Sequence, residues 1–194
     1  QAGLKPDAVV IVATVRALKM HGGVAKKDLG EENLEALRKG IENLEKHIEN
    51  IAKYNLPSVV AINAFPTDTE AELQLLDEIC KSKGVDVAIS QVWAKGADGG
   101  IKLAEKLLDV LETKKADFHP IYDTELPIAE KIRTIAKEIY GADDVIFTKK
   151  VTNKIKKYEE QGLGNLPICV AKTQYSLSDD PTLLGRPSGF KVTI

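Results

Sequence analysis

Residues 8–15, AVVIVATV, form an unbroken apolar run that is rich in β-branched side chains. Such a run is typical of a parallel strand whose two faces are both covered, so we expect a strand here with helices on either side of it. Similar apolar runs occur at residues 58–62 (SVVAI), 85–89 (VDVAI) and 167–171 (PICVA). These four runs predict the central strands of one parallel sheet.

Long helical patterns separate these runs. In residues 31–54 the apolar side chains recur every three or four positions, which is the spacing of an amphipathic helix. Further helices are predicted at 69–82, with Thr67 or Asp68 as N-cap, and at 100–112, 128–140 and 149–161, and further short strands at 144–148 and 190–194. Alternation of strands and helices predicts a three-layer α/β fold, with a mainly parallel sheet and helices on both faces.

The composition is that of a globular domain. Of 194 residues, 43% are hydrophobic, and 27 Lys and Arg against 29 Asp and Glu leave a net charge of -2. This balance provides no basic field for nucleic acid or an anionic membrane, so we expect neither as a partner. Cys80 and Cys169 lie far apart, and the three histidines are scattered, so the spacing predicts no protein-held metal and favours the cytoplasm. The division of patterns suggests two segments, 1–115 and 116–194.

Polar or glycine-rich loops follow each of the four central runs. These loops are residues 14–23, 63–70, 91–99 and 172–181. Because parallel strands end at the same edge of a sheet, we expect the four loops to meet there and to build one site.

Two aromatic residues occupy equivalent places in these loops. Phe65 and Trp93, the only tryptophan, each lie two or three residues beyond the expected end of a strand. Two rings on neighbouring loops can hold a planar heterocycle between them, and Pro66 stiffens the first loop. The alternative is that both rings pack beneath their own loops over the edge of the core.

Cationic side chains accompany glycines in two of the loops. Arg16 and Lys19 precede two glycines, which predicts a basic, flexible turn able to meet a phosphate or carboxylate. Lys95 lies in the glycine-rich turn after Trp93, where Asp98 is the expected cap of the next helix. The alternative for both turns is an ordinary solvated loop.

Four stretches resemble, in the same order, segments of formate–tetrahydrofolate ligase, also called 10-formyltetrahydrofolate synthetase. They are VIVATVRALKMHGG, INAFPTDTEAE, VWAKGADGG and PICVAKTQYSLSDDP, and the resemblance runs along essentially the whole chain. It implies a P-loop NTPase-like enzyme that uses formate and ATP with Mg²⁺ to make formyl phosphate, and then formylates N10 of tetrahydrofolate, as a homo-oligomer. Family members are longer, so the resemblance implies an internal fragment that lacks the P-loop and is inactive alone; no GxxxxGK[ST] motif occurs in the chain.

The resemblance also implies roles for the loop residues. In the family the pterin stacks between a phenylalanine and a tryptophan that match Phe65 and Trp93. Arg16 or Lys19 would hold an anionic intermediate, and Lys95 would meet the glutamate tail of the folate. The segment that approaches adenine in the family matches a loop whose nucleotide candidates are Tyr175, Ser176, Ser178 and Pro181.

Two other functions remain open at this point. One is an α/β module that binds a pterin or purine without turnover. The other is a structural, Rossmann-like domain that binds no ligand.

Overall fold

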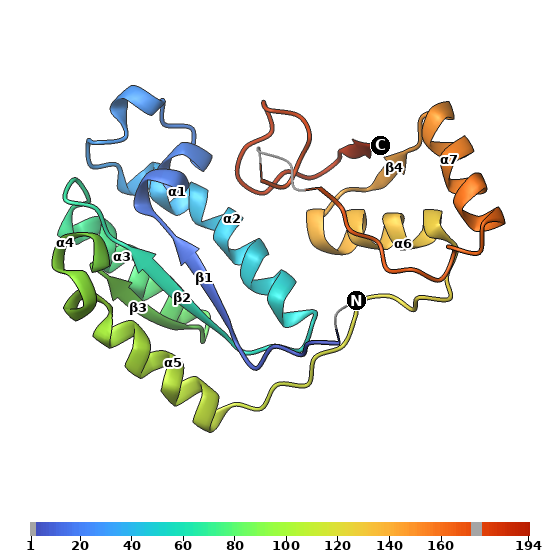
Figure 1. Ribbon diagram of the computed structural model, residues 1–194. Coiled ribbons are helices and arrows are strands. Elements are labelled where there is room, and N and C mark those ends of the chain that lie inside the picture. The colour runs from blue at the N-terminus through green and yellow to red at the C-terminus, as the bar shows by residue number, and fades with distance from the viewer. Residues whose placement is uncertain (1–2, 172–175) are drawn as a thin grey trace. The chain divides into compact units, whose positions relative to one another are not determined.

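The computed structural model describes residues 3–171 and 176–194 (Figure 1). These residues form two compact units. Lys5–Phe118 is the first, and His119–Ile194 belongs to the second together with the start of the chain. Within the described ranges, no helix offers an apolar stretch sufficient to span a lipid bilayer.

The first unit is built on a parallel sheet of three strands. These are β1 (Val9–Ala13), β2 (Ser58–Asn63) and β3 (Asp86–Ser90), in the order β1-β2-β3. The register is regular, and it ends with Asn63 of β2 opposite Ser90 of β3. The strands predicted from the first three apolar runs are therefore confirmed, as is their parallel pairing.

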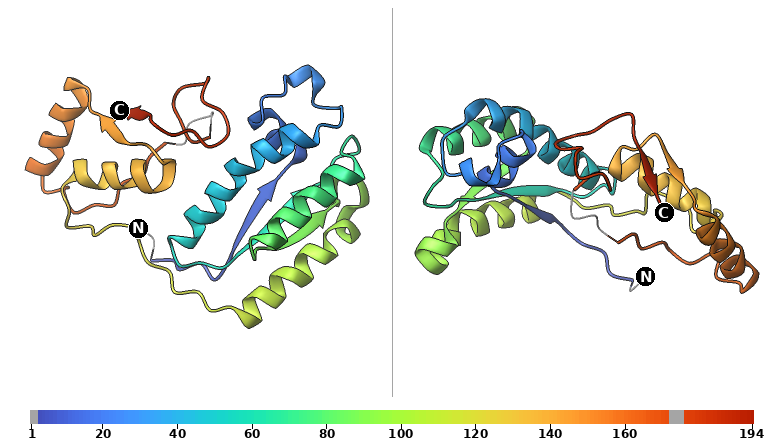
Figure 2. Two further views of the ribbon diagram at one scale, coloured as in Figure 1. Left: turned by 180° about the vertical axis from the view of Figure 1, so that it is seen from behind. Right: turned by 90° about the horizontal axis from the view of Figure 1, so that it is seen from above.

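Helices cover both faces of this sheet, as Figure 2 shows. One face is covered by α1 (Val15–His21), α2 (Leu34–Ala52) and α3 (Glu70–Ser82), and the other by α5 (Ile101–Thr113). A short 3-10 helix, Lys26–Asp28, lies between α1 and α2. The α/β class and the predicted helical layers are thus confirmed.

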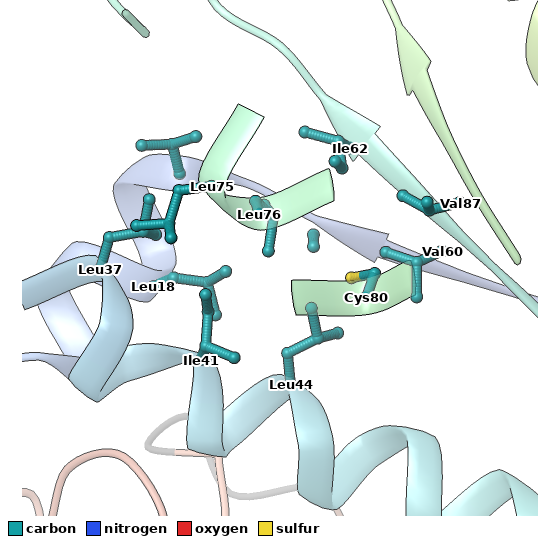
Figure 3. Close-up of a cluster of buried hydrophobic side chains, with 12 residues drawn as sticks. Leu18, Leu37, Ile41, Leu44, Val60, Ile62, Leu75, Leu76, Cys80 and Val87 are labelled. Atoms are coloured by element: carbon teal, nitrogen blue, oxygen red, sulfur yellow. The ribbon is translucent and has the colours of Figure 1, made fainter. Parts of the chain in front are cut away.

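The core of the first unit lies between the sheet and its three-helix face. Its side chains are apolar residues from the inner faces of the helices and from the strands that these helices cover. They include Leu18, Leu37, Ile41, Leu44, Val60, Ile62, Leu75, Leu76, Cys80 and Val87 (Figure 3). Burial raises the pKa of the Cys80 thiol to about 11, so this cysteine is an uncharged core residue.

One expectation about β1 is wrong. Its apolar run predicts cover on both faces, but Val10 is 36% and Val12 66% exposed. The reason is that α5 packs mainly against β3 and β2, while β1 lies at the edge of the sheet. Only the face of β1 that carries Ile11 and Ala13 joins the core.

Side-chain caps fix where α2 and α3 begin, and the cap predicted for α3 is wrong. Helix α2 begins at Leu34 because the Asn33 side chain accepts a hydrogen bond of 2.9 Å from Ala36 N. Thr69, and neither Thr67 nor Asp68, caps α3. Its Oγ1 accepts from Glu72 N at 3.2 Å, and Glu72 Oε2 accepts from Thr69 N at 3.1 Å, which is a capping box.

The second unit combines two helices with a small parallel sheet. Helix α6 (Ile128–Ile135) continues into a π-helical turn, Ala136–Tyr140, and α7 spans Lys149–Glu160. Strands β4 (Asp144–Ile146) and β5 (Lys191–Thr193) pair in parallel, as the two short apolar runs predict. The core of this unit consists of Ile128, Ile132, Ala136, Ala142, Val145 and Phe190.

The run at residues 167–171 is not a strand, which corrects the prediction of a fourth central strand. The N–H of Ile168 donates to the Tyr122 hydroxyl at 2.8 Å, so a side chain takes the place of a ladder partner. The preceding segment is tied to α6 by the buried Lys131, whose Nζ donates to the carbonyls of Gly164 (2.6 Å) and Leu166 (3.1 Å). The described part of the loop that follows, residues 176–181, belongs to the second unit and does not follow a strand of the three-stranded sheet.

Candidate functional site

The carboxyl ends of β1, β2 and β3 lie at one edge of the sheet, and three of the four predicted loops leave from it (Figure 1). After β1 the chain enters α1. After β2 it forms the loop that contains Phe65. After β3 it forms α4 (Val92–Lys95) and a 3-10 turn, Gly96–Gly100. This edge is the candidate site.

The Phe65 loop is a tight turn that Asp68 closes. Phe65 N–H donates to Asp68 Oδ2 at 2.8 Å, and Asp68 N–H donates to the carbonyl of Phe65 at 3.0 Å. The residue before the turn, Ala64, donates its N–H to the Ser90 carbonyl at 3.0 Å, which extends the β2–β3 ladder. Pro66 is exposed at the second position of the turn, a place that its fixed φ favours.

Trp93 projects from α4 into solvent. Its side chain is 71% exposed. The base of this loop is closed by a hydrogen bond of 2.9 Å from Gln91 N to the Gly99 carbonyl. A Cβ on Gly99 would lie 2.4 Å from the backbone carbon and oxygen of Gln91, so only glycine permits this closure.

The strand register relates the two aromatic residues. Asn63 and Ser90 are paired at the ends of β2 and β3. Phe65 follows Asn63 by two positions and Trp93 follows Ser90 by three, so both rings leave the sheet from neighbouring strand ends. Among the described residues, neither ring stacks on another ring. The stacked aromatic pair is Tyr54 and Phe118, which lies outside these loops.

A polar cavity of about 260 Å³ lies beside the Trp93 loop. Its lining comes from α3, β3, α4 with its N-cap, the 3-10 turn and the first turn of α5, and consists of Leu73, Ile89, Gln91, Lys95, Asp98, Gly99 and Lys102. Lys95 Nζ donates to Gln91 Oε1 at 2.7 Å. Sequence reasoning missed Lys102, because the only signal was its position two residues after the double glycine. Asp98 does not cap α5, whose N-cap is Gly100 without a side-chain hydrogen bond.

The segment after β1 is a helix, which corrects the expected flexible basic turn. Thr14 Oγ1 accepts from Ala17 N at 3.1 Å and starts α1. Gly22 marks a close helix contact, since a Cβ there would lie 1.9 Å from the Ala36 carbonyl oxygen. Arg16 is exposed on this helix, whereas Lys19 is fully buried.

Lys19 has internal partners in this structure. Its Nζ forms an ion pair of 2.8 Å with Glu72 Oε1 and donates to the Glu31 carbonyl at 2.8 Å. Glu72 Oε1 also accepts from Asn33 N at 3.0 Å. Burial acts to raise the pKa of Glu72, but the hydrogen bonds from Lys19 and from the two backbone N–H groups outweigh it and hold this pKa below its usual value. Arg16 is therefore the cation that α1 offers to solvent.

The predicted nucleotide loop belongs to the second unit. Tyr175 lies outside the described residues. Ser178 is buried, and its Oγ accepts from Asp180 N at 3.0 Å, while Pro181 is exposed. Ser176 has a positive φ of 78°, which is uncommon for a residue other than glycine.

A second cavity, of about 340 Å³, lies in this unit. Its lining is mainly apolar and includes Tyr140, Cys169 and Ala171, with Asp179 of the nucleotide loop at one side. Within the described part of the chain, no three His, Cys, Asp or Glu side chains gather in a way that would hold a metal ion.

Comparison with known families agrees with the order of these motifs along the chain. A family model described as formate–tetrahydrofolate ligase matches residues 1–194. The match covers both units and all three loops of the candidate site. The chain therefore belongs to the formate–tetrahydrofolate ligase family.

Proposed function

We propose that the edge of the three-stranded sheet binds the pterin of tetrahydrofolate between Phe65 and Trp93. The observation that carries the proposal is the exposure of Trp93, 71%, on a loop whose base is fixed by the Gln91–Gly99 hydrogen bond. A packing tryptophan would be buried, whereas a stacking platform has to be open before its ligand arrives. The register of Asn63 and Ser90 places the Phe65 loop beside it.

The glutamate tail of the folate is the proposed ligand of the neighbouring polar cavity. Lys95 and Lys102 both line it, and their ammonium groups suit carboxylates. Gln91 holds Lys95 Nζ through its side-chain oxygen and so orients one of the two cations. We expect the Lys102→Ala substitution to weaken the binding of folates with several glutamates more than the binding of the monoglutamate. Lys106→Ala on the same helix is the control and should not make this difference.

The reaction we propose is that of an ATP-dependent ligase. Formate attacks the γ-phosphorus of ATP, which releases ADP and gives formyl phosphate. N10 of tetrahydrofolate then attacks the formyl carbon, phosphate leaves, and N10 loses its proton. Both steps depend on positioning and on neutralisation of charge, so this chain needs no nucleophile of its own.

The chain's other predicted residues have supporting places in this scheme. Arg16, exposed at the same sheet edge, is the proposed contact of an anionic intermediate. Lys19 supports α1 from beneath through Glu72. The proposed adenine contacts are Tyr175, Ser176, Ser178 and Pro181, and Asp179 of the same loop lines the apolar cavity of the second unit. Mg²⁺ enters with ATP, held mainly by phosphates and waters, and a cytoplasmic homo-oligomer is the proposed setting.

Folate binding to the complete protein tests this proposal. Trp93 is the only tryptophan of these 194 residues, so the part of the quenching by tetrahydrofolate that a Trp93→Phe substitution removes reports this site. Phe65→Ala should weaken the titrated affinity, while Phe118→Ala, which removes a ring stacked 6.1 Å from Tyr54, should not. Equal affinities for the Phe65→Ala variant and the unmodified protein would refute the stacking site.

Turnover separates a ligase from a module that only binds. The complete protein should release phosphate from ATP when formate and tetrahydrofolate are both present. The chain printed here should not, because no GxxxxGK[ST] motif is available in it to hold the β- and γ-phosphates. Phosphate release by this chain that an Arg16→Ala substitution abolishes would show that the phosphate site is misplaced.

A further inference from the structure

We propose that Asp68 is a positioning residue for tetrahydrofolate binding, because its carboxylate fixes the backbone from which the Phe65 ring projects. This inference rests on the proposed stacking site. It assigns to Asp68 a task that the ring itself cannot perform, which is to hold the Phe65 loop in one conformation before the ligand arrives.

The two residues are bonded in both directions. Phe65 N–H donates to Asp68 Oδ2 at 2.8 Å, and the Phe65 carbonyl accepts from Asp68 N–H at 3.0 Å. On the other side, Ala64 is tied to Ser90 of β3 by a hydrogen bond of 3.0 Å. The backbone of Phe65 is therefore fixed at its N–H, at its carbonyl and through the residue before it.

Asp68 has no helix-capping duty that would explain its carboxylate. Thr69 caps α3, and Glu72 completes the capping box. The second carboxylate oxygen, Asp68 Oδ1, is buried and has no hydrogen-bond partner among the described residues. The hydrogen bond to Phe65 N–H is thus the specific interaction that this side chain makes.

The charges around Asp68 come from two helices. Glu72 of α3 repels the carboxylate, while Lys19 and Arg16 of α1 attract it. Burial is the largest influence, and it raises the pKa of Asp68 above its ordinary value. Burial of a carboxylate is unfavourable, so its presence here is consistent with a geometric task, and the hydrogen bond to Phe65 N–H identifies that task as closure of the Phe65 turn.

Two substitutions at this position separate geometry from charge. Asp68→Asn keeps an acceptor oxygen at the same distance from the backbone and removes the charge. Asp68→Glu keeps the charge and displaces the acceptor by one methylene. If position matters, Asp68→Glu should raise the KM for tetrahydrofolate roughly 2- to 10-fold, the range that a lost aromatic contact gives. Asp68→Asn should stay within about 2-fold of the unmodified protein on the same scale.

A selective change in one kinetic constant distinguishes a positioning role from a general effect on folding. In the complete protein, Asp68→Glu should change the KM for tetrahydrofolate while the KM values for ATP and formate, and kcat at saturating folate, stay constant. A parallel fall of all constants, or a loss in Asp68→Asn that equals the loss in Asp68→Glu, would overturn the proposal.

Combination with Phe65→Ala distinguishes this inference from the stacking site on which it rests. Once the ring is removed, Asp68→Glu should add no further loss, because the two residues act through one contact. If Phe65→Ala weakens folate binding but Asp68→Glu does not, the positioning role is wrong and the stacking site stands. If Phe65→Ala itself has no effect, the stacking site fails first.

Discussion

Lys19 of α1 and Glu72 of α3 form an ion pair of 2.8 Å in which both side chains are fully buried. Glu72 also accepts hydrogen bonds from the backbone N–H groups of Asn33, at the start of α2, and of Thr69, at the start of α3. One carboxylate thus joins three helices directly beneath the loops of the candidate site. This group therefore links the helices that follow the first two loops of the site.

Removal of one partner of this pair should be costly. In the Lys19→Met variant the Glu72 charge stays buried without its cation, and we expect the free energy of unfolding to fall by about 3 to 5 kcal/mol. Urea denaturation followed by circular dichroism measures this loss. The control is Lys81→Met, which breaks an exposed pair with Asp77 and should cost less than about 1 kcal/mol. Similar losses in the two variants would contradict a buried, unscreened pair.

Stability should depend on pH through the same carboxylate. The pKa of Glu72 is lower in the folded protein than its ordinary value of 4.5. The folded state therefore binds this proton less tightly than the unfolded state, so the stabilisation is complete above the ordinary pKa and is lost as pH falls through the lower, folded pKa. The difference in unfolding free energy between the unmodified chain and Glu72→Gln should shrink below about pH 4.5. If the difference in unfolding free energy grew as the pH fell, the predicted direction of the Glu72 pKa shift would be wrong.

Trp93 should contribute more to ligand binding than to folding. Trp93→Ala removes a ring that is 71% exposed, so we expect roughly 1 to 3 kcal/mol of lost folate affinity from lost stacking and apolar burial, and a smaller loss of stability. The affinity is measured by calorimetry and the stability by thermal unfolding, both in the complete protein. An unchanged KM for tetrahydrofolate, together with more than about 3 kcal/mol of lost stability, would make Trp93 a packing residue.

Gly99→Ala tests whether loop closure presents Trp93. The added Cβ would meet the Gln91 backbone at 2.4 Å, so the hydrogen bond between these residues has to open and the Trp93 loop has to shift. We expect a higher KM for tetrahydrofolate, by about the factor that a lost stacking contact gives. Gly164→Ala is the matched control, because a Cβ there meets the Glu159 side chain at an ordinary 3.7 Å. Equal changes of this KM in the two variants would show that closure of the Trp93 loop does not affect folate binding.

The parts of the fold that follow from local periodicity were predictable. The apolar runs at β2 and β3 and the spacing of Leu37, Ile41 and Leu44 in α2 produce the elements they predict, because burial of one face decides them. The run at 167–171 is also mainly apolar but is not a strand, and the N–H of Ile168 donates instead to the hydroxyl of Tyr122, which is distant in sequence.

The candidate site was predictable in residue type but not in its internal contacts. The loop positions of Phe65 and Trp93 follow from where strands end. Lys19 looks like any loop cation in the sequence, and only the folded chain brings Glu72, a residue 53 positions later, against it. Gly22 likewise suggests a flexible turn, although its actual role is to let α1 approach the backbone of Ala36.

The exposed face of β1 affects how this chain behaves in a test tube. An edge strand with Val10 and Val12 open to solvent can pair with a strand of another molecule, which is the start of sheet-to-sheet aggregation. We expect the isolated chain to sediment as larger species at high concentration. A charge introduced by Val12→Lys should keep it monodisperse, since natural edge strands use lysine against such pairing. Protein that carries this substitution should therefore stay in solution longer at the concentrations that ligand titration needs.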